Sequence, residues 1–178
     1  RVLVGFREKR KPYIADIQRC EVLHPSVGER LHELAELISH MNARARIAQI
    51  EVAVGDDITV LVFRNLDPLS AEDRVRLTEY GQRSGLHIYL QPGGPDSIEL
   101  LWPEMSTLYY RLPDQNIEVR FQPTDFTQVN TAINRSMVPQ ALELLELEES
   151  DTVLDLFCGL GNFTMPIARK VAAVVGVE

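Results

Sequence analysis

The sequence has little cysteine and no long apolar run. Its two cysteines, Cys20 and Cys158, are too few for the disulfide framework of a small secreted domain, so we expect a reducing, cytoplasmic environment. No run of apolar residues approaches the ~20 that span a bilayer. The first residues carry charges where a signal peptide would have an apolar core. Membrane proteins and secreted proteins are therefore excluded as classes.

Acidic residues predominate over the whole chain but not at its start. The net charge is −8, yet residues 1–50 hold nine Lys and Arg against six Asp and Glu, and residues 51–178 hold nine against twenty. A basic segment favours contact with a polyanion such as RNA, and an ordinary solvated strand end is the alternative. The candidate RNA contacts are four cations near the start: Arg7, Lys9, Arg10 and Lys11.

Both ends of the sequence are typical of a fragment. The chain opens on Arg1 directly in an alternating apolar segment, and it closes on residues 174–178 with the pattern of a buried central strand. Such a strand needs neighbouring strands and covering helices. We therefore expect this chain to be part of a longer protein.

Residues 1–122 have the pattern of an α+β domain. Apolar residues at helical spacing predict helices over 25–42 and 71–84, and the second helix has Ser70 as its N-cap and Gly85 as its stop. Short alternating segments between Gly and Pro turns predict strands over 2–7, 13–17, 46–54, 58–64, 86–90, 98–101, 107–110 and 117–121. We expect a largely antiparallel central domain.

The pattern changes after Gln122 and Pro123. From there the sequence predicts a helix over 131–146, a strand over 153–157, a helix over 161–170 and a strand over 172–177. This alternation is typical of the start of a Rossmann-like α/β domain. Residues 123–178 are therefore expected to be the first part of such a domain, with the boundary near residue 122.

A glycine turn follows the first strand of this second domain. Gly159 and Gly161 allow a tight turn and close approach of a ligand, at the strand end where open α/β sheets bind nucleotides. Asp155 lies inside the strand, where a carboxylate needs a partner, and Glu178 ends the next strand, placed to accept hydrogen bonds from ribose hydroxyls. A dinucleotide site needs a third glycine where Thr164 stands, so an NAD-dependent oxidoreductase is disfavoured.

The run from Asp155 to Phe163, together with Phe126-Thr-Gln-Val-Asn130 and Asn134, resembles the RNA uracil-5-methyltransferase family, most closely its members that modify 23S ribosomal RNA. The likeness also includes Val4-Gly-Phe-Arg7 and the segment from Cys20 to Pro25. The resemblance implies an S-adenosylmethionine-dependent methyltransferase that acts on 23S ribosomal RNA, and it implies no protein partner. It also implies four cofactor contacts, at Gln128, Phe157, Asn162 and Glu178, to which the turn itself adds Asp155, Gly159 and Gly161.

The same resemblance places the catalytic nucleophile and base outside this chain. Uracil C5 becomes nucleophilic only after a thiolate adds at C6, but Cys158 lies within the cofactor loop. No residue here is therefore expected to be catalytic, and the chain alone is expected to be inactive. Cys20 matches the fourth ligand of a [4Fe-4S] cluster whose other cysteines would lie upstream.

Two alternatives to ribosomal RNA methylation remain open. One is a uracil-5-methyltransferase that acts on transfer RNA, and the other is a non-catalytic RNA-binding module whose α/β half binds a nucleotide.

Overall fold

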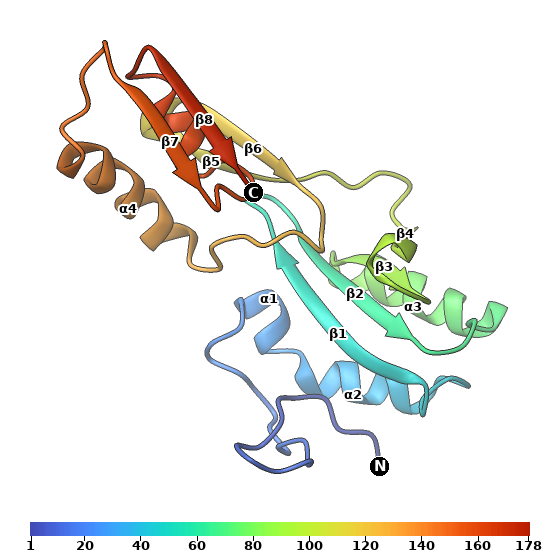
Figure 1. Ribbon diagram of the computed structural model, residues 1–178. Coiled ribbons are helices and arrows are strands. Elements are labelled where there is room, and N and C mark those ends of the chain that lie inside the picture. Colours follow the sequence, from blue (N-terminus) through green and yellow to red (C-terminus); the bar gives the residue numbers. More distant parts are fainter. The chain divides into compact units, whose positions relative to one another are not determined.

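The computed structural model describes residues 1–178 and confirms the α+β class. The chain forms two compact units (Figure 1). The first unit contains Arg1–Val54 and Ile58–Ser106, and the second contains Gly55–Asp57 and Thr107–Glu178. The domain boundary near residue 122 stays a prediction, because a compact unit need not coincide with a functional domain.

A four-stranded sheet in the order β1-β2-β3-β4 forms the centre of the first unit. Its strands are β1 (Ile47–Val54), β2 (Thr59–Asn65), β3 (His87–Gln91) and β4 (Glu99–Trp102). The pairs β1/β2 and β3/β4 are antiparallel, but β2 and β3 are parallel and are joined by helix α3 (Ala71–Ser84). Two parallel neighbouring strands cannot be joined by a hairpin, so the chain crosses from the end of β2 to the start of β3 through helix α3.

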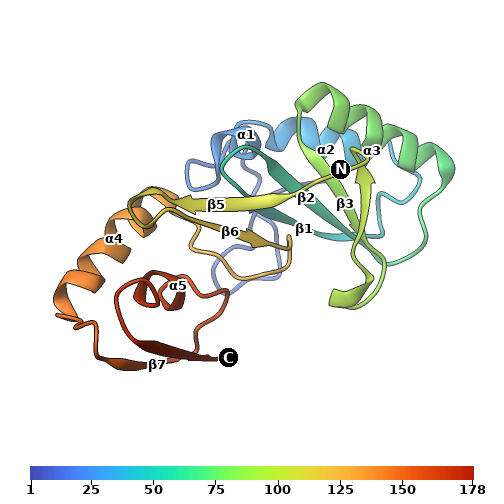
Figure 2. The same cartoon turned by 90° about the horizontal axis from the view of Figure 1, so that it is seen from above.

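Helices α2 (Leu31–Ser39) and α3 pack on one face of this sheet (Figure 2). Their buried apolar residues form one cluster with residues of β2 and β3: Leu34, Ile38, Leu77, Tyr80, Leu61, Phe63, Ile88 and Leu90. This contact explains the helical spacing of apolar residues in the sequence, because each helix buries one stripe.

The prediction of one continuous helix over 25–42 is wrong. The structure has a short helix α1 (Pro25–Gly28) and then α2. The carbonyl of Gly28 accepts a hydrogen bond from the N–H of Cys20 at 3.0 Å. A Cβ at Gly28 would lie 2.3 Å from the Cys20 carbonyl oxygen, so only glycine fits where these two segments meet.

The N-terminal segment does not form the two predicted strands. It has a single antiparallel bridge between Arg7 and Ile14, supported by backbone hydrogen bonds from Glu8 to Tyr13 and from Ala15 to Phe6, both 2.9 Å long. The two segments therefore lie side by side, but the ladder is too short to count as strands.

Asp73 is the buried acid of the first unit, and it ties α3 to the segment that follows α2. Its side chain is 0% exposed. One carboxylate oxygen accepts from the N–H of Asn42 at 2.8 Å and the other from the N–H of Ala43 at 2.9 Å. The backbone N–H of Asp73 donates to the hydroxyl of Ser70 at 3.1 Å, which confirms Ser70 as the N-cap. The carboxylate thus satisfies two backbone donors outside its own helix.

The second unit combines an antiparallel hairpin with a parallel strand pair. Its elements are β5 (Leu108–Leu112), β6 (Ile117–Phe121), α4 (Thr131–Leu144), β7 (Thr152–Leu156), α5 (Thr164–Ile167) and β8 (Ala173–Val177), with 3₁₀ turns at Pro95–Ser97 in the first unit and Pro113–Gln115 in the second. β7 and β8 pair in parallel, as predicted. The helix predicted over 161–170 is one turn, α5, and the segment before it is the glycine loop.

The turn between β1 and β2 belongs to this second unit. The carboxylate of Asp56 accepts from the guanidinium of Arg135 on α4 at 2.8 Å and from the N–H of Arg111 on β5 at 3.0 Å. The side chain of Arg135 also donates to the carbonyl of Arg111 at 3.0 Å. These bonds join α4 to the β5/β6 hairpin.

No helix in the chain has the length and apolar character needed to cross a membrane.

Candidate functional site

The loop after β7 is shaped by three residues in the left-handed region. Gly159 and Gly161 have φ values of 52° and 85°, and Phe157 has 59°. The glycines adopt this conformation at no steric cost, whereas an aromatic residue does so only at a cost of ~1 kcal/mol. The loop therefore turns sharply at the carboxyl end of β7, as the glycine spacing predicts.

The side chain of Phe157 lies outside the apolar core. It is 90% exposed. An exposed aromatic ring contributes little to packing, and its strained backbone conformation is of the kind found at ligand-binding sites. This geometry agrees with an aromatic wall beside a bound cofactor, which stays a prediction.

The half-buried carboxylate of Asp155, in β7, has a hydrogen-bond partner within this chain. The hydroxyl of Thr164, at the start of α5, donates to Asp155 Oδ2. Thr164 stands where a dinucleotide site would have its third glycine. The same residue that disfavours a dinucleotide site thus satisfies the carboxylate inside the strand.

Glu178 links the end of β8 to the glycine loop. Its Oε2 accepts from the N–H of Gly159 at 2.6 Å. A charge-assisted bond of this length holds the loop against the strand end. The carboxylate keeps its second oxygen for a ligand, which suits the predicted contact with ribose hydroxyls.

Asn162 is fixed by two other polar side chains. Its carbonyl oxygen accepts from the hydroxyl of Tyr110 at 3.0 Å and from the amide of Asn134 at 2.9 Å, and its own amide donates to Asn134 at 2.9 Å. Tyr110 lies on β5 and Asn134 on α4. The partnership of Asn162 with these two residues was not predicted from the sequence, because neither lies near it along the chain.

Gln128 lies apart from this group in its hydrogen bonding. It is exposed on the segment between β6 and α4, and no hydrogen bond joins it to the glycine loop. The neighbouring Asn130 caps α4 by accepting from the N–H of Ile133 at 3.0 Å. Six of the seven predicted cofactor residues thus lie on or beside the glycine loop, and Gln128 lies on a separate segment.

Cys158 has a packing role in the loop. A Cβ at Gly176 of β8 would lie 2.9 Å from the Cys158 sulfur, and the Cys158 N–H donates to the carbonyl of Val177 at 3.2 Å. The thiol therefore fills the space that Gly176 leaves open. That Cys158 is not the nucleophile stays a prediction.

The residues of this chain do not form an iron–sulfur site. Cys20 is half-buried, and no group of three or more His, Cys, Asp or Glu side chains gathers to hold a metal ion. A single thiolate cannot hold a [4Fe-4S] cluster. The predicted cluster is therefore not supported by this chain.

The four predicted RNA-contacting cations are all exposed. Lys11 forms an ion pair with Glu8 at 3.0 Å, and Arg10 has a φ of 62° in the loop that the Arg7–Ile14 bridge closes. Exposure makes these side chains accessible to a polyanion, and the contact stays a prediction.

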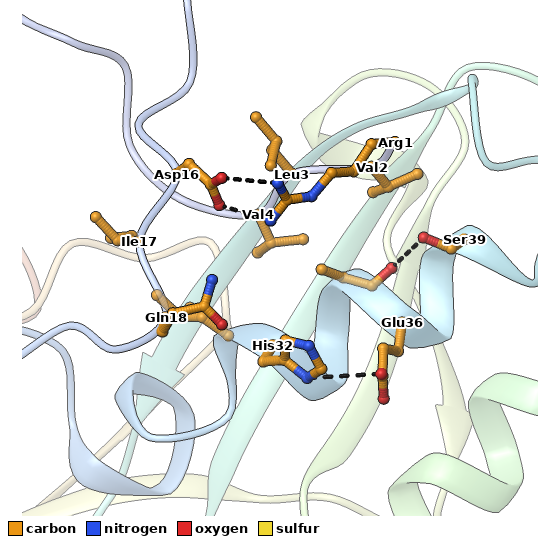
Figure 3. Close-up of a pocket in the computed structure, with 12 residues that line it drawn as sticks. Arg1, Val2, Leu3, Val4, Asp16, Ile17, Gln18, His32, Glu36 and Ser39 are labelled. Carbon is orange, nitrogen blue, oxygen red and sulfur yellow. Dashed lines mark hydrogen bonds and ion pairs between the residues drawn. The ribbon is translucent and has the colours of Figure 1, made fainter.

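A cavity of about 200 Å³ lies between the N-terminal segment and α2 (Figure 3). Its polar groups pair with one another, Arg1 with Asp16 at 2.9 Å and His32 with Glu36 at 3.7 Å. The hydroxyl of Ser39 donates to the carbonyl of Ala35 at 2.7 Å. No polar side chain of this cavity is both deeply buried and unpaired, so it lacks the marks of a ligand site.

The chain is similar in sequence to bacterial enzymes that modify ribosomal RNA. It is 53% identical to the 23S rRNA (uracil(1939)-C(5))-methyltransferase RlmD of Alcanivorax borkumensis, over 99% of this chain and 40% of the relative. It is 54% identical to the RlmD of Alkalilimnicola ehrlichii and 53% identical to that of Nitrosococcus oceani, again over 40% of each relative. The chain thus spans about 40% of the length of these curated relatives, and the resemblance to the 23S branch of the family is confirmed.

A solved structure shares the fold. The tRNA (uracil-54, C5)-methyltransferase of Pyrococcus abyssi, crystallised with S-adenosyl-L-homocysteine, superposes with a TM-score of 0.65 over 99% of this chain and 54% of that one, at 17% identity. In addition, the family model described as tRNA (Uracil-5-)-methyltransferase matches residues 16–178. The chain therefore belongs to the tRNA (uracil-5-)-methyltransferase family.

Proposed function

We propose that the protein containing this chain methylates C5 of a uridine in 23S ribosomal RNA, with S-adenosylmethionine as the methyl donor. The observation that carries the proposal is the glycine loop after β7, held by Glu178 and flanked by the exposed ring of Phe157, in a chain 53% identical to RlmD enzymes. The residues present fit such a cofactor, because an aromatic face, a strand-end carboxylate and two left-handed glycines meet at the adjacent ends of β7 and β8.

Each proposed contact follows from the chemistry of its side chain. The ring of Phe157 covers an apolar face of the cofactor, and the carboxylate of Glu178 accepts from ribose hydroxyls. The amides of Gln128 and Asn162 contact its polar groups. Asp155, Gly159 and Gly161 shape the loop around it. When bound, the cofactor supplies an electrophilic methyl group.

The reacting uridine needs groups that this chain does not provide. A thiolate must add at C6 of a flipped-out uridine so that C5 becomes nucleophilic, and after methyl transfer a base must remove the C5 proton so that the thiolate can leave. Cys158 is packed against Gly176, and Cys20 is in the first unit. We therefore assign the nucleophile and the base to other parts of the protein and expect the chain alone to be inactive.

The remaining parts of the proposal concern RNA and cellular location. Residues 1–122 would form a central domain that holds the RNA through Arg7, Lys9, Arg10 and Lys11, and residues 123–178 would begin the catalytic domain. Cys20 would be one cluster ligand at most, and no step here depends on a cluster. An enzyme of this kind works in the cytoplasm, where ribosomes are assembled.

Methyl transfer from labelled S-adenosylmethionine tests the substrate. The full-length protein is offered unmodified 23S ribosomal RNA and transfer RNA in parallel, and the labelled nucleoside is identified after digestion. We expect label at uridine C5 of the ribosomal RNA only. Label only in transfer RNA would overturn the substrate, and label in neither would favour an RNA-binding module.

A further inference from the structure

Three polar side chains from separate elements meet beside the glycine loop. Tyr110 comes from the middle of β5, Asn134 from the first turn of α4, and Asn162 from the loop between β7 and α5. The two amides bond to each other in both directions at 2.9 Å, and the Tyr110 hydroxyl adds a third bond of 3.0 Å to Asn162.

The hydrogen-bonding capacity of Asn162 is almost used up by this network. An amide oxygen has two lone pairs and an amide nitrogen two donors. Tyr110 and Asn134 occupy both lone pairs of Asn162 Oδ1, and Asn134 Oδ1 takes one of the two Nδ2 donors. One N–H of Asn162 is left for a ligand, and this side chain has no remaining acceptor.

Two of the three residues in the network are buried. Asn134 is 3% exposed and Tyr110 is 8% exposed, whereas Asn162 is half-buried. Burial also raises the pKa of Tyr110 above its ordinary value, which keeps the phenol protonated into the alkaline range so that it remains a donor. A buried, satisfied network of this kind holds its members in one arrangement.

We propose that Tyr110 and Asn134 are positioning residues, which hold Asn162 so that its remaining N–H donates to an acceptor atom of the cofactor. The acceptor is an oxygen of the cofactor's carboxylate or ribose, or a ring nitrogen of its base; the cofactor's ammonium group is excluded as a partner of this side chain. The inference rests on the proposed function, because it assumes that the glycine loop binds S-adenosylmethionine.

The test measures how tightly the full-length protein binds S-adenosylhomocysteine. Tyr110→Phe removes one hydroxyl and keeps the ring, which packs against Phe121 with centroids 6.0 Å apart. A neutral hydrogen bond contributes about 1 kcal/mol, so we expect the Kd to rise about three- to tenfold. The KM for S-adenosylmethionine should rise by a similar factor while the KM for RNA stays unchanged. Tyr109→Phe is the matched control, because Tyr109 is the preceding residue of the same strand and its hydroxyl bonds to Asp57 instead.

A double variant separates positioning from general stability. If Tyr110 acts only through Asn162, adding Tyr110→Phe to Asn162→Ala will not raise the Kd further. Asn134→Ala should raise the Kd at least as much as Tyr110→Phe, and thermal midpoints measured in parallel report any loss of folding.

Three results would overturn the positioning role. These are an unchanged Kd for Tyr110→Phe, an equal rise for Tyr109→Phe, or a full additional rise when Tyr110→Phe is placed on Asn162→Ala. If Gln128→Ala and Glu178→Ala weaken binding in the same experiment, the cofactor site stands and only the positioning role fails. If the unaltered protein does not bind S-adenosylhomocysteine, the proposed function fails as well.

Discussion

Phe157→Asn in the full-length protein is expected to weaken binding of S-adenosylhomocysteine by about tenfold or more, without lowering the thermal midpoint. Contact between an aromatic ring and a base is worth ~1–3 kcal/mol, which is the affinity the variant should lose. Stability should be kept because the ring is 90% exposed and the backbone, at a φ of 59°, is in a region that asparagine tolerates better than phenylalanine. Calorimetric titration and thermal unfolding measure the two quantities.

Phe157→Tyr is the control for this prediction, because it keeps the ring and the strained backbone. We expect it to bind with nearly unchanged affinity. Equal affinity of Phe157→Asn and the unaltered protein would show that the ring does not contact the cofactor. A large fall in the thermal midpoint of Phe157→Asn would instead show that the ring supports the fold.

Asp73→Ala is expected to destabilise the first unit by ~3 kcal/mol, which is a large part of the stability of an ordinary domain. The variant leaves the N–H groups of Asn42 and Ala43 without their partner in a position where Asp73 is fully buried. Unpaired buried donors are costly, and bonds to a charged group are the stronger kind. Hydrogen exchange followed by mass spectrometry should show the amides around Asn42 exchanging on the order of a hundredfold faster.

Glu72→Ala provides the matched control, since it removes the same charge from the same turn of α3. Glu72 is exposed and its contacts are the amide of Asn42 at 3.2 Å and the guanidinium of Arg76 at 3.7 Å. Exposed pairs contribute little, so we expect a change below ~1 kcal/mol. Similar exchange rates for Asp73→Ala and Glu72→Ala would contradict the role given to the buried carboxylate.

Most elements were predictable because their patterns are local. The alternation in β1 and β2, the Ser70 cap of α3 and the parallel pair β7/β8 all follow from short stretches of sequence. The errors arose where distant segments decide the structure. The helix over 25–42 is interrupted because Gly28 meets Cys20, and residues 2–7 and 13–17 form one bridge where two strands were expected.

The candidate site divides in the same way. The glycine turn, the acidic strand end and Asp155 inside its strand could be predicted from the sequence, because they lie within or directly after two strands that follow each other in the chain. The bonds of Thr164 to Asp155 and of Tyr110 to Asn162 are not, because periodicity says nothing about which side chains meet in space. The exposed ring and positive φ of Phe157 could not be predicted either, because an apolar residue at the end of a strand is equally compatible with core packing.

Calorimetric titration of S-adenosylhomocysteine into the full-length protein tests the central claim most directly. The unaltered protein should bind one equivalent, Gln128→Ala and Glu178→Ala should each bind about tenfold more weakly or worse, and Glu143→Ala, which removes an exposed carboxylate from α4, should bind normally. Unchanged affinity in both site variants, or no binding by the unaltered protein, would contradict a cofactor site at the ends of β7 and β8.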